Sequence, residues 1–219
     1  PYYFKRLILR NSGNDNVNKH PLNTHFRDLL IHEIARKSFT DPMTAAGKPV
    51  NVFLNGSYYG IFNLRERIDQ FYIETHKGVT DNYDLLERAF GFPANENPVF
   101  GSFENWDALM SFADTTGNLA EQDDFDYLAT QVDLENFTNY WMTEVFAGNY
   151  DWLSNNVKYW KPADGKWQWI FWDLDHGLGL KYNEYGLVDW NTLKWSLTTS
   201  DRAWANGYNN RLIRNLMRN

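Results

Sequence analysis

Hydrophobic and polar positions alternate near the start of the chain and then take on a helical period. The segment 4–10 predicts a strand, and the polar run after it predicts a loop. Over 23–39, apolar residues recur at the spacing of an amphipathic helix, with Asn23 or Thr24 as the expected N-cap. The pair Asn55-Gly56 between two apolar runs predicts a β-hairpin. The first part of the chain should therefore be a small mixed sheet carrying one helix.

From Asp69 onwards the pattern becomes mainly helical. A second hairpin is predicted over 157–175, with its turn at Pro162–Gly165. The expected helices cover 69–77, 102–114, 133–149 and 208–219.

This order of elements predicts an α+β fold with two lobes and a cleft between them. Residues 1–68 would form the sheet lobe with its one helix. Residues 69–219 would form a mainly helical lobe that carries the second hairpin.

The composition of the chain excludes some classes of binding partner and of functional site. The chain has 219 residues, 43% of them hydrophobic and 17% aromatic, which is enough for a folded core. Its formal net charge of -7, with Lys and Arg scattered along the sequence, argues against nucleic acid or an anionic membrane as the main partner. Because there is no cysteine, disulfides, thiolate metal sites and a cysteine nucleophile are excluded.

The sequence contains no apolar run that approaches the length of a membrane span. It begins at Pro1 without a start methionine or a secretion signal, so we expect an internal piece of a longer protein. Richness in Trp, Tyr and Asn is typical of secreted bacterial carbohydrate-active and surface proteins. An extracellular or cell-surface location is therefore expected.

Two segments rich in Asn and Asp flank the second predicted hairpin. Asp151 and Asn156 lie in the loop before its first strand, and Asp173 and Asp175 lie at the exit of its second strand. Residues two apart in a strand face the same side, and hairpin strands are neighbours, so these side chains should converge. Carboxylate and amide oxygens suit a hard cation such as Mg²⁺ or Mn²⁺, and a nearby Asp could act as a general base.

Each of these residues also has a purely local interpretation, because Asp and Asn cap helices and shape turns. The joint arrangement is harder to explain locally, since like charges at Asp173 and Asp175 repel unless a cation or a donor such as His176 compensates them. Glu66 would face a ligand at the lobe junction or pair with a neighbouring arginine, and Arg27 is either a cleft residue or a solvated charge. Most of Trp167, Trp169 and Trp172 are expected in the core, and a sugar-binding platform is the alternative for them. The His residues lack zinc-binding spacing.

Several motifs occur in a fixed order along the chain: LRNSGND, FRDLLIHEIAR, VNVFLNGSYYGIFNLRERID, NYDWLSNNVKYW and IFWDLDHGLG. This succession resembles the spore coat protein H (CotH) kinase-like family. The resemblance covers nearly the whole chain, and VFLNGSYYGIFNLRERID and WDLDHGLG are its most specific parts.

The resemblance implies an atypical protein-kinase fold that binds ATP and a divalent metal and passes phosphate to a Ser or Thr hydroxyl of a protein. Asp151 and Asn156 reproduce the five-residue spacing of a kinase catalytic loop, and Asp175 with the two residues after it resembles the Asp-Phe-Gly element. It implies that Asp151 orients or deprotonates the acceptor hydroxyl. It also implies metal binding by Asn156 with Asp173 and Asp175, and a place for Glu66 on the hinge side of the nucleotide.

Phosphoryl transfer also needs a cation over the phosphates. The family's Arg-Gly-Asn-Ser-type loop and its Lys-bearing strand would lie upstream of Phe4, so Arg27, and after it Arg10, are the remaining candidates.

Three functions remain open from the sequence. The first is an ATP- and metal-dependent protein kinase-like domain acting on Ser or Thr. The second is a catalytically silent surface or adhesion domain, or a module associated with polysaccharide-degrading machinery. The third is a glycoside hydrolase, which needs two carboxyl groups flanking a sugar-sized groove. Asp173 and Asp175 are too close together and too alike in setting for that role.

Overall fold

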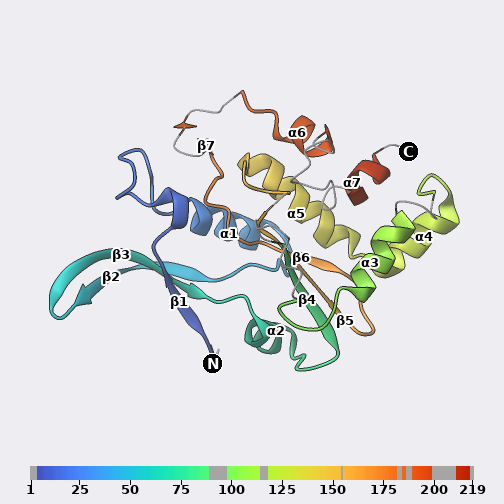
Figure 1. The fold of residues 1–219 in the computed structure, drawn as a ribbon, viewed down its shortest axis with the longest axis horizontal. Coiled ribbons are helices and arrows are strands. Elements are labelled where there is room, and N and C mark those ends of the chain that lie inside the picture. The colour runs from blue at the N-terminus through green and yellow to red at the C-terminus, as the bar shows by residue number, and fades with distance from the viewer. Residues whose placement is uncertain are drawn as a thin grey trace.

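A computed structural model of the protein describes residues 4–88, 98–113, 118–153, 155–181, 184–185, 189–198 and 211–217 (Figure 1). The helices are α1 (Arg27–Ser38), α2 (Gln70–Lys77), α3 (Glu104–Ser111), α4 (Gln122–Gln131), α5 (Leu134–Ala147), α6 (Thr192–Thr198) and α7 (Arg211–Leu216). The strands are β1 (Leu7–Arg10), β2 (Gly47–Leu54), β3 (Ser57–Glu66), β4 (Tyr83–Arg88), β5 (Val157–Pro162), β6 (Gln168–Ile170), β7 (Leu180–Lys181) and β8 (Glu184–Tyr185). The predicted α+β class is confirmed. The ends of the predicted 208–219 helix lie outside the described residues.

The first sheet has the strand order β1-β3-β2 and is antiparallel throughout, rather than mixed as predicted. Its β2–β3 hairpin turns at Asn55 and Gly56, which have φ values of 51° and 82°. Two adjacent residues with positive φ match the right-handed twist of the strands, which confirms the predicted turn. Figure 1 shows this hairpin projecting away from the rest of the molecule.

The N-terminus of helix α1 is capped by Asp15, a residue of the long loop that precedes the helix. The predicted caps are wrong, because Phe26 occupies the N-cap position and makes no side-chain cap bond. Instead, Asp15 Oδ2 accepts the Arg27 N–H at 3.0 Å, and Asp15 Oδ1 accepts the Thr24 N–H at 2.7 Å. A carboxylate twelve residues upstream therefore satisfies the first backbone donor of the helix.

The second sheet has the order β4-β5-β6. The β5–β6 hairpin was predicted, whereas β4 was not, so the inserted hairpin is part of a three-stranded antiparallel sheet. Trp167 and Trp169 are buried in the larger hydrophobic core, as expected for the hairpin tryptophans.

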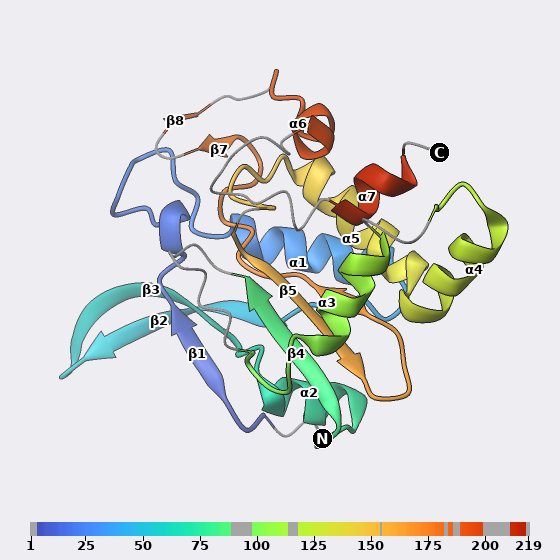
Figure 2. The ribbon, with the colours of Figure 1, turned by 45° about the vertical axis from the view of Figure 1, so that its right-hand side comes forward.

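Helix α1 joins the two parts of the fold. It lies between the first sheet and α5 in both views (Figures 1 and 2). Ile31 and Ala35 of α1 belong to the same core cluster as Phe137 of α5 and Leu86 of β4. Burying a side chain the size of Ile31 contributes about 1.5–3 kcal/mol, so this packing fixes α1 on α5 and the second sheet. In the described part of the chain, none of the helices has the length and apolar character needed to cross a membrane.

Candidate functional site

Asp151 lies in the loop that follows α5. Gly148 has φ 62° and ends the helix in the left-handed conformation that glycine adopts without strain. The chain then reverses, and Asp151 Oδ2 accepts hydrogen bonds from Asn155 Nδ2 at 3.0 Å and Asn156 Nδ2 at 3.1 Å. Asn156 stands directly before β5. The structure therefore brings together the first two residues of the predicted site.

Asp173 and Asp175 meet for a reason different from the predicted one. Strand β6 ends at Ile170, and Asp173 has φ 51°, so the two carboxylates are not neighbours on one face of a strand. They converge on Arg10, whose Nη2 binds Asp173 Oδ1 and lies 3.1 Å from Asp175 Oδ2. Arg10 is thus the compensating cation that the sequence requires for this pair.

Arg10 ends β1, so the site combines the first sheet with the segment after the second. Burial alone would lower the pKa of Arg10, but Asp173 and Asp175 raise it above the ordinary value. The guanidinium stays charged between two carboxylates. Its Nη1 has no hydrogen-bond partner among the described residues.

The two carboxylates differ in access. The Asp175 side chain is 2% exposed, and its Oδ2 accepts the Asn14 N–H at 2.8 Å in addition to Arg10. The Asp173 side chain is 24% exposed, and its Oδ2 has no hydrogen bond within the described part of the chain. The loop after β1 therefore buries the Asp175 carboxylate. The Asp173 carboxylate is partly exposed, and its Oδ2 makes no hydrogen bond with the described residues.

Gly13 makes room for Asp175. It has φ 54°, and a Cβ placed on it would lie 2.0 Å from Asp175 Oδ2. We predict that Gly13→Ala destabilises the protein by about 2–4 kcal/mol, because Ala adds backbone strain and displaces the carboxylate. Urea unfolding measures this loss.

Gly56→Ala is the matched control for that substitution. Gly56 also has positive φ, at 82°, but a Cβ there meets nothing within 4 Å. Gly56→Ala should therefore lower the free energy of unfolding only by the backbone strain, about 1 kcal/mol. Equal losses for the two variants would show that contact with Asp175 is unimportant.

The backbone between the two carboxylates is held by α1 and β3. Leu174 N–H donates to Asp28 Oδ1 at 2.9 Å, and Asp28 also forms a buried ion pair with Arg65. Arg65 Nη2 lies 2.9 Å from Nε2 of His32. Burial and the nearby Arg36 lower the pKa of His32 to about 3, so His32 is neutral. Burial lowers the pKa of Arg65 only to about 10, so Arg65 still balances the charge of Asp28 near neutral pH.

The site residues influence one another electrostatically. Burial raises the pKa of Asp151, the charge of Asp173 raises it further, and His176 and the amide of Asn155 oppose this rise. Burial also raises the pKa of Asp173, against the effect of Arg10. Burial lowers the pKa of His176. Two nearby carboxylates with raised pKa values favour a bound cation, and a raised pKa also suits a general base.

Glu66 and Arg27 form their hydrogen bonds with residues outside the Arg10 and Asp151 cluster. Glu66 Oε1 lies 2.7 Å from His76 Nε2, and Glu66 Oε2 accepts the Ala46 N–H at 2.7 Å. Arg27 pairs with Asp15. Their predicted roles toward a nucleotide remain predictions, and their hydrogen bonds serve the local structure.

Sequence reasoning missed several residues that contact the site or the loop beside it: Gly13, Asn14, Asp28, Arg65, and Glu144, which accepts a hydrogen bond from Asn149, two residues before Asp151. A signal was available for two of them. Asp28 shares a helix face with the buried Ile31 and Ala35, and Glu144 shares one with the buried Tyr140 and Ala147. A charged residue at a core-facing position of a helix is rarely buried unless it is paired.

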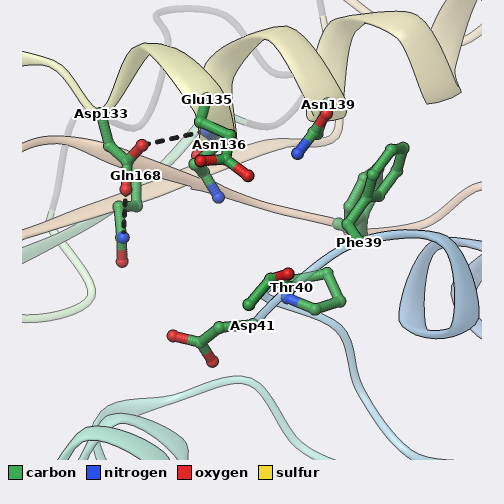
Figure 3. A pocket seen from close by; sticks show the side chains of 10 residues that line it. Phe39, Thr40, Asp41, Asp133, Glu135, Asn136, Asn139 and Gln168 are labelled. Atoms are coloured by element: carbon green, nitrogen blue, oxygen red, sulfur yellow. Dashed lines mark hydrogen bonds between the residues drawn. The ribbon is translucent and has the colours of Figure 1, made fainter.

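A pocket of about 230 Å³ lies between the start of α5 and the segment after α1 (Figure 3). Several of its polar groups already have partners, since Asp133 accepts from Asn136 N–H and from Gln168 Nε2. Asn136 in turn bonds both backbone groups of Trp169. These contacts fix β6 on α5. The lining of this pocket includes none of the predicted site residues. The candidate site is therefore separate from the pocket and consists of the residues around Arg10 and Asp151.

The donor set fits a hard cation. Asp173 Oδ2, Asp151 Oδ1 and Asn156 Oδ1 have no hydrogen-bond donor among the described residues. Mg²⁺ is usually held by one or two carboxylates and completed by water and phosphate oxygens, and Mn²⁺ accepts similar ligands. In the ranges that the structure describes, no group of three or more His, Asp or Glu side chains is arranged to hold a metal by itself.

The comparisons with known proteins bear on the whole chain. A family model described as CotH kinase protein matches residues 2–219. No curated protein matches the sequence.

Proposed function

The chain belongs to the CotH kinase protein family, and on that basis we propose that it binds ATP with Mg²⁺ or Mn²⁺ and transfers the γ-phosphate to a Ser or Thr of a protein. The observation that carries the proposal is that Asp151 bonds Asn156 and has its pKa raised by the charge of Asp173, which in turn pairs with a buried, charged Arg10. Phosphoryl transfer depends mainly on positioning and charge neutralisation, and these four residues supply both.

Asp151 would act as the general base. Its Oδ2 is held by Asn155 and Asn156, which leaves Oδ1 to accept the proton of the acceptor hydroxyl. The hydroxyl oxygen then forms a bond to the γ-phosphorus, the bond from that phosphorus to the β–γ bridging oxygen breaks, and ADP leaves. The raised pKa of Asp151 brings it nearer the working pH, which favours proton transfer.

Asp173 and Asn156 would hold the metal, which when bound neutralises charge on the phosphates. Asp173 is preferred over Asp175 because its side chain is the more exposed and its Oδ2 accepts no hydrogen bond from the described residues. Arg10 is preferred over Arg27 as the cation facing the phosphates, since within the described residues its Nη1 makes no hydrogen bond, while Arg27 is paired with Asp15.

Thermal melting with ATP and Mn²⁺ tests the proposal. A ligand at a hundred times its Kd that binds only the folded chain adds about 2.7 kcal/mol of stability. We expect the melting temperature to rise with Mn-ATP, to return to its starting value with EDTA, and to show no rise in Asp173→Asn. Asp175→Asn should melt earlier without ligand but keep a shift, because Asp175 is enclosed by the loop after β1.

The converse pattern would contradict the assignment. If the rise in melting temperature with Mn-ATP persists in Asp173→Asn and is lost in Asp175→Asn, Asp175 and not Asp173 binds the metal. No shift in the unchanged protein would remove the nucleotide from the proposal.

A silent binding module is the second candidate. The observation in its favour is that Arg10 already compensates the charges of Asp173 and Asp175 without a metal. The projecting hairpin also exposes apolar side chains to a partner: Phe53, Leu54, Tyr58 and Tyr59. An absent Mn-ATP shift would favour this candidate. The extracellular or cell-surface location and the protein acceptor remain part of the proposal.

A further inference from the structure

Glu144 lies completely buried on the last turn of α5. Its Oε2 accepts a hydrogen bond from Asn149 Nδ2 at 2.9 Å, and its backbone carbonyl accepts the Asn149 N–H at 3.2 Å. Asn149 is also fully buried, and its Oδ1 accepts the Asp151 N–H at 3.3 Å. A chain of hydrogen bonds therefore runs from the helix interior to the backbone of Asp151.

The same face of α5 holds the other side of Asp151. Trp152 Nε1 donates to the hydroxyl of Tyr140 at 3.0 Å. Tyr140, Glu144, Asn149 and Trp152 are all buried. The residue directly after Asp151 is thus bonded to Tyr140, and the residue two before it is bonded to Glu144, both on α5.

Packing alone does not explain why a carboxyl group is buried at position 144. Burying a carboxyl group costs free energy unless its partners satisfy it, and an apolar side chain of similar size would fill the same space. Local folding of α5 does not require the group, because the helix already ends at Gly148. The contacts of Glu144 point instead to the loop that carries the proposed base.

We propose that Glu144 is a positioning residue that fixes the backbone of Asp151 through Asn149. Its effect on a rate rests on the proposed function, whereas its effect on the loop does not. Glu144 touches neither the acceptor nor the nucleotide in this scheme, so it acts on chemistry only through the placement of Asp151.

Three variants test this role. Glu144→Met keeps a similar volume and removes the hydrogen bonds. Glu144→Gln keeps an amide that can bond Asn149, and Asn149→Ala removes the link from the loop side. Glu135→Met makes the same change at an exposed position of α5 and serves as the control.

Two readouts are needed. The first is hydrogen exchange of the Asp151 amide by NMR, which requires no activity. The second is transfer from γ-labelled ATP to dephosphorylated casein, with kcat and the KM for ATP measured separately. In Glu144→Met and Asn149→Ala we expect Asp151 exchange to accelerate about tenfold or more and kcat to fall about tenfold, with little change in KM. Glu144→Gln and Glu135→Met should resemble the unchanged protein in both.

The proposal is overturned if folded Glu144→Met and Asn149→Ala keep the Asp151 exchange rate of the unchanged protein. It is also overturned if Glu144→Gln is as defective as Glu144→Met, or if kcat and KM deteriorate together. Should Glu144→Met fail to fold, Asn149→Ala decides alone. If the unchanged protein transfers no phosphate and shows no Mn-ATP shift, the proposed function fails, while the exchange measurement still decides the role of Glu144.

Discussion

Replacement of Asp151 by Asn is expected to lower the rate of phosphate transfer to casein by roughly 10²- to 10⁴-fold, the range that a positioned general base contributes. Asn has the same shape but cannot take the proton of the acceptor hydroxyl. The melting shift with Mn-ATP should persist, because Asp151 is assigned to the acceptor and Asp173 with Asn156 to the metal. Loss of rate with retention of binding is the signature of a residue that acts in the transition state.

Asp164→Asn provides the control for that experiment. Asp164 is exposed in the turn between β5 and β6, so the same chemical change there should leave the rate unaltered. A rate in Asp151→Asn within about threefold of the unchanged protein would rule out Asp151 as the base, since that contribution spans orders of magnitude.

Replacement of Glu144 by Gln is expected to stabilise the protein in a manner that depends on pH. Burial raises the pKa of Glu144 from 4.5 to about 8, against the effect of the hydrogen bond from Asn149. Between these two values the folded chain retains a proton that the unfolded chain has released. The free energy of unfolding therefore falls by about 1.4 kcal/mol per pH unit in this window, whereas Gln has no proton to lose.

The difference between the two proteins should be near zero at pH 4.5 and grow to about 4–5 kcal/mol at pH 8, where it levels off. Urea unfolding at pH 5 and pH 8 measures it. Other titrating groups are shared by both proteins and cancel in the difference. Near Glu144, Tyr140 does not ionise in this window, because burial raises its pKa well above the ordinary value. A difference that does not grow with pH would show that Glu144 is already ionised in the folded protein.

The sequence predicts those parts of the fold that depend on neighbouring residues. The Asn55-Gly56 turn, the span and Gly148 end of α5, and the closeness of Asp151 and Asn156 all follow from local periodicity and spacing. Strand β4 was missed, although it pairs along its whole length with β5. Its six residues include three charged side chains, so the apolar alternation of a half-buried strand is weak there.

The arrangement of the carboxylates was predicted for the wrong reason. Strand geometry was expected to bring Asp173 and Asp175 together, but the strand ends earlier and Arg10 unites them. The partners of this segment, Arg10 and Asp28, lie on a different sheet and a different helix. Spacing along the chain contains no information about such contacts, because they depend on how the two sheets pack.

The cluster around Arg10 also determines when the site can form during synthesis of the chain. Arg10 is 163 residues before Asp173, and Asp28 is 146 residues before Leu174. At roughly 5–20 residues per second, about 8–33 s separate the synthesis of the first pair of partners. The β2–β3 hairpin needs only adjacent residues and can form early. Until residues 173–175 emerge from the ribosome, Arg10 and Oδ1 of Asp28 lack the partners that they have in the folded protein. The contacts that join α1 and β1 to the proposed catalytic segment are therefore completed only after that segment has been made.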